Sequence, residues 1–268
     1  MNENTIGIDA GGSLIKIAFE EKSRIHFKKY SIEDLESAFN WLKMFAASKR
    51  IVLTGGKAGS IKADFFQEAE IVNEFKAACE GAMYLMEQEK ISLQEKVLLV
   101  NIGTGTSWFV MEGSHYERVL GSGIGGGTFM GLGTLLGDSR DFSELVELAS
   151  IGTRGKVDLL VKDIYHPEEP PIPGDLTASN FAKASKSKES SAADQVAAVI
   201  NMISETITLL SVQAATLHST KKVIYIGSTL SGNKVLQSYL EKYAKMSGLE
   251  SVFLQNGEYS GALGAKRI

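Results

Sequence analysis

Cysteine and histidine are scarce in this chain, and their scarcity excludes several kinds of chemistry. The single cysteine, Cys79, rules out an intrachain disulfide and any zinc site built from several thiolates. The four histidines stand far apart in the sequence, and none has a second histidine at the spacing of paired metal ligands. We therefore expect structural roles for all four histidines.

A strong charge bias and a long hydrophobic run are also missing. The formal net charge is −4 in 268 residues, which gives no reason to expect nucleic acid or an anionic membrane surface as a partner. No apolar run approaches the roughly 20 residues of a membrane-spanning helix, and the chain enters a predicted strand without a signal peptide. We predict a cytoplasmic globular protein that is large enough for two lobes.

Proline is confined to one short segment, whereas glycine is concentrated in another. All four prolines lie within residues 166–175, which favours a stiff surface loop. Eight glycines fall within residues 121–137, and apolar residues at helical spacing begin near Gly127 or Thr128. A flexible linker is the alternative, but glycines that lead into a helix are typical of an anion or nucleotide surface.

The first glycine turn lies in the segment IGIDAGGSLIKIAF, residues 6–19. Its alternation of side chains predicts two strands joined by a turn, and Asp9 stands where the first strand ends. The exposed amides of such a turn form an anion nest, Lys16 adds a positive charge, and an aspartate there can anchor Mg²⁺ through water. A hairpin with a plain Gly-Gly turn is the alternative interpretation.

The same pattern returns in LLVNIGTGTSWFV, residues 98–110. Asn101 takes the place of Asp9, and Gly103 takes that of Gly11. Two such hairpins suggest a duplicated fold with a nucleotide between its halves. Neither turn has the sequence of a P-loop or opens directly into a helix as a dinucleotide fingerprint does.

One acidic residue, Glu74, falls on an apolar helix face. The spacing predicts a helix from about Ile71 to Glu87, with Glu74 among small and apolar neighbours. A carboxylate in such surroundings is rarely buried without a function. The alternative is a glutamate that turns to solvent at the helix start, where the helix dipole favours it.

Two more glycine turns follow predicted strands. The turn Gly55–Gly59 comes after the strand 51–54 and is either part of a site or a sharp exit from the sheet. Gly227 comes after the strand 223–226, where an adenosine contact and an ordinary strand-to-helix turn are both possible. The apolar helix predicted over 194–217 is either an interface or a buried core helix.

Together these motifs resemble the actin, hexokinase and Hsp70 superfamily, and more narrowly the type II pantothenate kinases. The segments that carry the resemblance are Asp9–Lys16, Glu74–Phe75, Asn101–Ser107, Arg118 with Gly125–Phe129, Pro170–Thr177, Ile226–Ser228, and Asn256–Gly257 with Ser260–Ala262. The resemblance implies an α/β, duplicated ribonuclease H-like fold with ATP in a cleft. It places an N-terminal lobe at 1–95 and a C-terminal lobe at 96–268.

The resemblance further implies ATP-dependent phosphorylation of the primary hydroxyl of pantothenate, the first step of coenzyme A synthesis. Asp9 would hold Mg²⁺ through water, Ser13 keeps the hydroxyl of a commoner threonine, and Phe142 stands where a tyrosine can occur. The implied nucleotide-binding residues are Asp9, Ala10, Gly11, Gly12, Ser13, Leu14, Ile15, Lys16, Thr104, Gly126, Gly127, Thr128, Phe129, Met130, Phe142 and Ser228.

The implied acceptor site has four members. Glu74 matches the general base, Arg118 and Thr177 match pantothenate contacts, and Tyr243 matches an aromatic that reaches the pocket across a dimer interface. The resemblance therefore implies a homodimer. An arginine suits the pantothenate carboxylate because its planar guanidinium can bind both oxygens.

Three other functions fit parts of the pattern. A sugar kinase of the same fold would usually have an aspartate base and a cluster of polar residues for sugar hydroxyls, which is absent around Glu74. An ATPase that activates 2-hydroxyacyl-CoA dehydratases needs two cysteines per subunit for a shared iron–sulfur cluster, and Cys79 is alone. A non-catalytic, nucleotide-gated binding protein would bind ATP without turnover that depends on Glu74.

Overall fold

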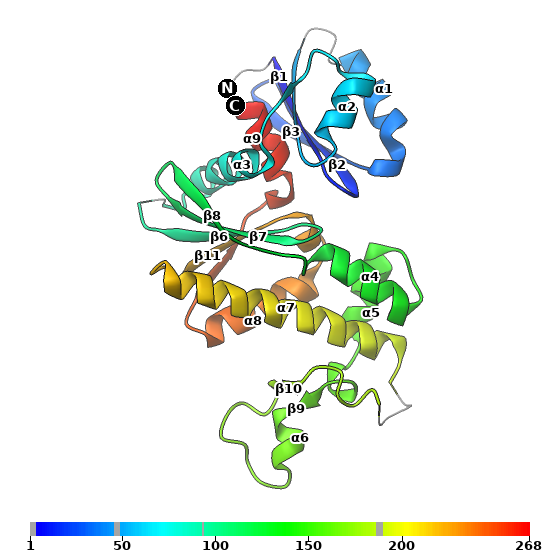
Figure 1. Cartoon of the computed structure of the whole chain (residues 1–268), viewed down its shortest axis with the longest axis vertical. Helices are drawn as coiled ribbons and strands as arrows, with labels where there is room; N and C mark the ends of the chain where they lie inside the picture. Colours follow the sequence, from blue (N-terminus) through cyan, green and yellow to red (C-terminus); the bar gives the residue numbers. More distant parts are fainter. Residues whose placement is uncertain (1–3, 46–48, 93, 186–189) are drawn as a thin grey trace.

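Two five-stranded mixed sheets form the framework of the protein (Figure 1). The computed structural model describes residues 4–45, 49–92, 94–185 and 190–268. The first sheet has the strand order β3-β2-β1-β4-β5. Its strands are β1 (Thr5–Ala10), β2 (Leu14–Glu21), β3 (Arg24–Ser31), β4 (Arg50–Thr54) and β5 (Glu70–Ile71).

The second sheet repeats the layout of the first, with the order β12-β11-β6-β7-β8. Its strands are β6 (Val97–Ile102), β7 (Thr106–Glu112), β8 (His115–Ser122), β11 (Lys222–Ile226) and β12 (Glu250–Phe253). In each sheet three consecutive antiparallel strands are extended by two parallel ones. The duplicated fold predicted from the two glycine hairpins is thus confirmed.

Each sheet is covered by its own helices on the outer face. The helices α1 (Leu35–Phe45) and α2 (Ala58–Phe65) pack on the first sheet. The outer cover of the second sheet consists of α4 (Gly126–Gly137), α5 (Phe142–Ile151), α7 (Ala192–Leu217) and α8 (Lys234–Met246). Strand β6 is apolar on both faces, as a covered strand must be: Leu98 and Val100 join this outer core, and Leu99 joins the core on the other side.

Two helices lie between the sheets, α3 (Glu74–Gln88) and α9 (Ser260–Arg267). They approach closely because both carry glycine at the crossing: a Cβ at Gly81 would lie 1.9 Å from the Ser260 carbonyl oxygen, and one at Gly264 would lie 1.8 Å from that of Ala77. Helix α9 also packs against β1. The lobe boundary at residue 95 stays a prediction. The chain after that boundary does not all pack on the second sheet, because α9 contacts the first sheet.

A small region projects beyond the second sheet (Figure 1). It contains β9 (Leu159–Leu160), α6 (Val161–Tyr165), the proline-rich loop and β10 (Thr177–Ser179). Within the described residues, α7 is the only helix long and apolar enough to cross a membrane, and 61% of its most apolar window is buried inside the structure. That degree of burial is typical of the core helix of a globular protein.

Three short features differ from the sequence-based expectations. Helix α3 begins at Glu74, not at Ile71, because Asn73 caps it by accepting hydrogen bonds from the amides of Phe75 and Lys76 at 3.0 and 3.1 Å. Ile71 belongs to β5 instead and is 50% exposed. Helices α2 and α5 were not predicted, although α5 carries Phe142, Leu145 and Ala149 at helical spacing.

The N-terminus of α7 offers a test of electrostatic stabilisation. Burial alone would raise the pKa of Asp194, but the Ser191 amide and hydroxyl, the Thr153 amide and the Lys156 ammonium all donate to it and hold the pKa far below its usual range. A depressed carboxyl pKa stabilises the fold above the unfolded value and loses this effect as the pH falls. We expect Asp194→Asn to lower the free energy of unfolding by about 1–2 kcal/mol at pH 7. Urea unfolding should show this deficit shrinking below about pH 4, whereas a deficit independent of pH would contradict it.

Candidate active site

The β1–β2 turn places an aspartate and a lysine side by side. Asp9 and Lys16 are directly opposed in the antiparallel ladder, and Lys16 Nζ lies 3.2 Å from Asp9 Oδ2. The carboxylate also lies against two backbones: a Cβ at Gly55 would be 2.8 Å from Oδ1, and one at Gly261 would be 2.8 Å from Oδ2. The Gly55 turn therefore touches this site, and the start of α9 closes it from the other side.

The β6–β7 turn faces the β1–β2 turn. A Cβ on Gly12 would lie 3.8 Å from Thr104 Oγ1, so the two glycine turns of the repeated fold meet across the cleft. Among the described residues, no group accepts a hydrogen bond from the Gly12 or Ser13 amide. These amides are available to an anion, which fits the expected phosphate nest.

The glycine-rich start of α4 packs tightly onto the second turn. The Gly126 and Gly127 amides donate to the carbonyl oxygens of Gly103 and Thr104, both at 2.8 Å. A Cβ on Gly126 would lie 2.4 Å from Thr229 Oγ1. The first amides of α4 are thus bonded to the β6–β7 turn and do not point to open solvent. Ser228 is the neighbour of Thr229 and follows the end of β11.

The other residues of α4 and α5 that are predicted to bind the nucleotide differ in burial. Phe129 is buried, and its ring meets that of Phe142 edge-on at 5.7 Å. Met130 and Phe142 are only partly buried. A nucleotide could therefore contact Phe142 or Met130 directly, and Phe129 through its backbone. The assignment of these residues to the nucleotide stays a prediction.

Glu74 is the first residue of α3 and lies close enough to Asp9 and Lys16 for their charges to act on it. Burial raises the pKa of its carboxyl, the nearby charge of Asp9 raises it further, and Lys16 lowers it. The side chain nevertheless keeps substantial exposure, so a ligand can reach it. A partly desolvated carboxylate beside a predicted phosphate site is suited to act as a general base.

Arg118 lies beside the helix start that carries Glu74. Its Cζ atom is 4.8 Å from the ring centroid of Phe75, and its Nε and Nη2 atoms lie 3.4 and 3.5 Å from Ser107 Oγ. The structure thus brings Arg118, from β8, next to Phe75, the neighbour of Glu74 on α3. An acceptor molecule could bridge a base and a cation here.

Thr177 and Tyr243 lie elsewhere in the chain. Both belong to a polar cluster between β10, α7 and α8. Helices α7 and α8 cover one face of the second sheet, and α3 lies on its other face (Figure 1). Thr177 Oγ1 donates to Glu205 at 2.5 Å and accepts from Arg154 and Asn201 at 2.9 and 3.1 Å. Tyr243 Oη donates to Asn201 Oδ1 at 2.5 Å. One chain therefore does not unite these two residues with Glu74 and Arg118.

Sequence patterns did not reveal the buried members of this cluster. Asp158 and Asn201 are fully buried, Arg154 is 9% exposed, and Arg154 Nη1 lies 3.3 Å from Asp158 Oδ2. Arg154 and Asp158 are four residues apart in one segment, whereas Asn201 comes from α7. No sequence motif links the two segments, so no local signal points to the cluster. Among the described residues, no group of three or more histidine, cysteine or acidic side chains has the arrangement of a metal site.

The raised pKa of Glu74 gives an expected pH dependence. If the ionised carboxylate is the base, kcat/KM must fall as the pH drops through that pKa. We expect the acidic limb to lie above pH 4.5, the ordinary value for glutamate. A pH–rate profile at saturating ATP measures it, and a limb at or below 4.5 would argue against a desolvated base.

Comparison with known proteins identifies the chain's relatives. The Fumble family matches residues 5–267. A type II pantothenate kinase of Oceanobacillus iheyensis is 41% identical over 260 residues, covering 97% of this chain and 97% of that protein. One from Staphylococcus epidermidis is 38% identical over 97% of this chain and 98% of that protein, and one from Bacillus cereus is 40% identical over 98% and 96%.

Solved structures with the same fold are more distant in sequence. The activator of the 2-hydroxyisocaproyl-CoA dehydratase from Clostridium difficile, with bound ADPNP, has a TM-score of 0.65 at 14% identity and covers 98% of this chain and 92% of its own. A ROK family glucokinase from Streptomyces griseus has a TM-score of 0.54 at 14% identity, with 98% of each chain covered. These likenesses confirm the actin-like ATPase fold and nothing finer. By sequence, the chain belongs to the Fumble family, together with the type II pantothenate kinases.

Proposed function

We propose that this protein transfers the γ-phosphoryl group of ATP to the primary hydroxyl of pantothenate, giving 4'-phosphopantothenate for coenzyme A synthesis. The observation that carries the proposal is the position of Glu74, a partly desolvated carboxylate at the edge of a cleft formed by two facing glycine turns. Full-length identity of about 40% to type II pantothenate kinases supports the choice of acceptor. The same relatives support a cytoplasmic enzyme.

The residues around the two turns fit a nucleotide and Mg²⁺. The Gly12 and Ser13 amides face the cleft without partners among the described residues, and the lack of a side chain at Gly12 leaves room between the turns. Asp9 would hold Mg²⁺ through water and Lys16 would face the phosphates, which requires their mutual pair to open. When bound, the ion neutralises charge on the phosphates during transfer.

Glu74 and Arg118 would contact opposite ends of the acceptor. Glu74 orients the primary hydroxyl and takes its proton late, because phosphoryl transfer depends chiefly on positioning and charge stabilisation. Arg118, stacked on Phe75, binds the carboxylate at the other end with its planar donors. Both ends of pantothenate are then recognised by groups on adjoining elements.

We further propose a homodimer, in which Thr177 and Tyr243 reach the acceptor pocket of the partner subunit. Within one chain they bond to Asn201 of α7, which lies on the opposite face of the second sheet from α3, and this separation supports the proposal. Helix α7, next to them, exposes Leu209 by 65% and Leu217 by 79% although most of the helix is buried. Light scattering should give a dimer mass that Leu209→Asp converts to a monomer; a wild-type monomer at micromolar concentration would contradict the proposal.

The direct test of function is ADP release from Mg·ATP, with and without pantothenate. We expect release that depends on pantothenate, together with a product heavier by one phosphoryl group in mass spectrometry. ADP release that ignores pantothenate would overturn the acceptor assignment. Turnover of glucose in its place would favour a sugar kinase.

A further inference from the structure

The guanidinium of Arg118 is held by an aromatic ring that also borders the cleft. Phe75 is 39% exposed, and its ring lies 4.8 Å from Arg118 Cζ and 5.7 Å from the ring centroid of Phe109. The Phe75 ring thus packs at a tilt against the buried Phe109 ring and also contacts the guanidinium. A large apolar ring so exposed at a helix start, with a cation over it, is a fixed support rather than a core residue.

A bulge in β8 brings the guanidinium against the backbone of its own strand. Residues three apart in a regular strand point to opposite faces. Trp108 pairs with Leu120, whereas Phe109 pairs with Arg118, so Val119 is an extra residue between them. The extra residue returns Arg118 to the side of Gly121, and a Cβ on Gly121 would lie 1.9 Å from Nη2.

The Arg118 guanidinium, placed beside Phe75 and Gly121, has no anionic partner in the part of the chain that the structure describes. Arg118 donates only to the Ser107 hydroxyl, and no carboxylate there lies within ion-pair distance of it. The side chain is exposed. Its planar fork is thus oriented but unsatisfied, which suits two oxygens of a ligand.

We infer that Phe75, Gly121 and the bulge at Val119 are positioning elements for Arg118, and that they set a preference for acceptors with an anionic end. The inference rests on the proposed function, because it takes Arg118 as the receptor for the acceptor's carboxylate. It adds Phe75 as a specificity-determining residue that acts through Arg118. It predicts that removing the ring harms charged acceptors more than neutral ones.

The test compares pantothenate with its primary amide, which lacks the charge but keeps the hydroxyl that is phosphorylated. In the wild type we expect a higher kcat/KM for pantothenate. Phe75→Leu should reduce this ratio about 3- to 30-fold, mainly through the KM for pantothenate, as expected for the loss of one cation–π contact. Gly121→Ala should reduce the ratio in the same direction, because its methyl group displaces the guanidinium.

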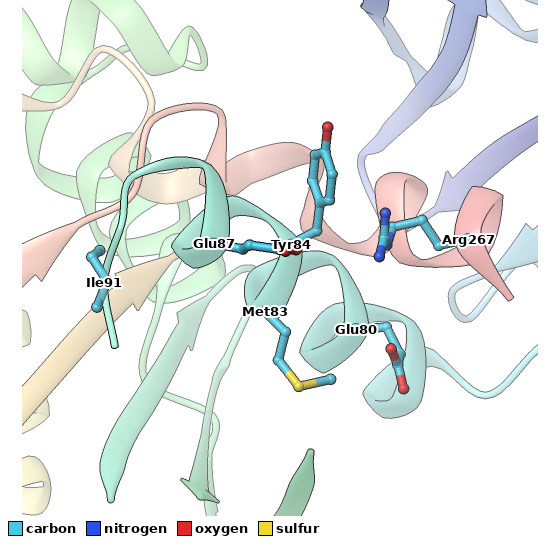
Figure 2. A pocket seen from close by; sticks show the side chains of 6 residues that line it. All are labelled: Glu80, Met83, Tyr84, Glu87, Ile91 and Arg267. Atoms are coloured by element: carbon cyan, nitrogen blue, oxygen red, sulfur yellow. The ribbon is translucent and has the colours of Figure 1, made fainter. Parts of the chain in front are cut away.

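Two further variants separate a specific effect from a structural one. In an Arg118→Met background, Phe75→Leu should leave the ratio unchanged, because the two residues act as one unit. Tyr84→Leu is the matched control. Tyr84 is on α3, as Phe75 is, and its ring centroid lies 4.4 Å from Cζ of Arg267 on α9. It lines a separate cavity of about 380 Å³ (Figure 2). The Tyr84 variant should keep the wild-type ratio.

The results of these assays test the role of Phe75 separately from the proposed phosphorylation of pantothenate. If the wild type phosphorylates neither acceptor, the proposed function fails and the inference fails with it. If the wild type is active but Phe75→Leu lowers both acceptors by the same factor, only the inference is overturned. A ratio that still changes with Phe75→Leu when Arg118 is methionine would likewise overturn it.

Discussion

Replacing Glu74 with glutamine is expected to lower kcat for pantothenate phosphorylation by about 10²- to 10⁴-fold, the usual contribution of a general base. Glutamine keeps the size of the side chain and its place after the Asn73 cap, but it cannot accept the proton of the hydroxyl. Steady-state ADP release measures the loss. Binding of a non-hydrolysable ATP analogue should stay intact, because the turns proposed to bind its phosphates lie at β1–β2 and β6–β7.

Glu80 provides the matched control for this substitution. It lies on the same helix but lines the outer cavity beside Tyr84 and Arg267 (Figure 2). Glu80→Gln should keep kcat within about twofold, as is usual for surface substitutions away from a site. Robust turnover by Glu74→Gln would keep the kinase but require another residue as the base.

Replacing Lys266 with methionine is expected to destabilise the fold by about 3–5 kcal/mol. Lys266 Nζ lies 2.8 Å from Glu20 Oε2, and the side chains are only 1% and 8% exposed. Removal of the lysine leaves the Glu20 carboxylate buried without this cation between α9 and β2. Urea unfolding monitored by circular dichroism should show a lower midpoint with an unchanged slope.

A double variant and a surface pair serve as controls. Adding Glu20→Leu to Lys266→Met should recover much of the loss, because replacing both members of a buried pair with apolar groups is often neutral or stabilising. Lys222→Met breaks a less buried pair with Glu250, at 3.8 Å, and should cost at most about 1 kcal/mol. Equal effects of Lys266→Met and Lys222→Met would show that burial of the pair contributes nothing.

The duplicated architecture could be predicted because its signals are local. Strand alternation and glycine turns lie within 14 consecutive residues at 6–19, and the same pattern at 98–110 is found as β6 and β7. The cap at Ser31 is local in the same way, because its hydroxyl accepts from the Glu33 amide two residues later, at 3.3 Å. Such features depend on neighbours in sequence, which a single chain displays directly.

The features that escaped prediction depend on residues distant in sequence. Arg154 and Asp158 meet Asn201 only because η2 (Arg154–Lys156) packs against α7. The bulge that turns Arg118 toward Gly121 arises from the pairing of β7 with β8, and the sequence of β8 alone does not show it. Glu74 was singled out by its apolar neighbours, whereas its raised pKa arises first from burial in the folded chain and then from the charge of Asp9 on β1. Assignment of these residues to substrates stays a prediction.

The contact of Gly261 with Asp9 has a consequence for biosynthesis. These residues pack together although 252 positions separate them, so the first sheet emerges from the ribosome well before α9 can cover it. At about 5–20 residues per second, that face of β1 waits roughly 10 to 50 s for its partner. During this interval Ala18, Ile25 and Phe27, on the face of the first sheet that α9 covers, remain without their final cover. The nascent chain therefore presents an apolar surface that chaperones can bind before the enzyme is complete.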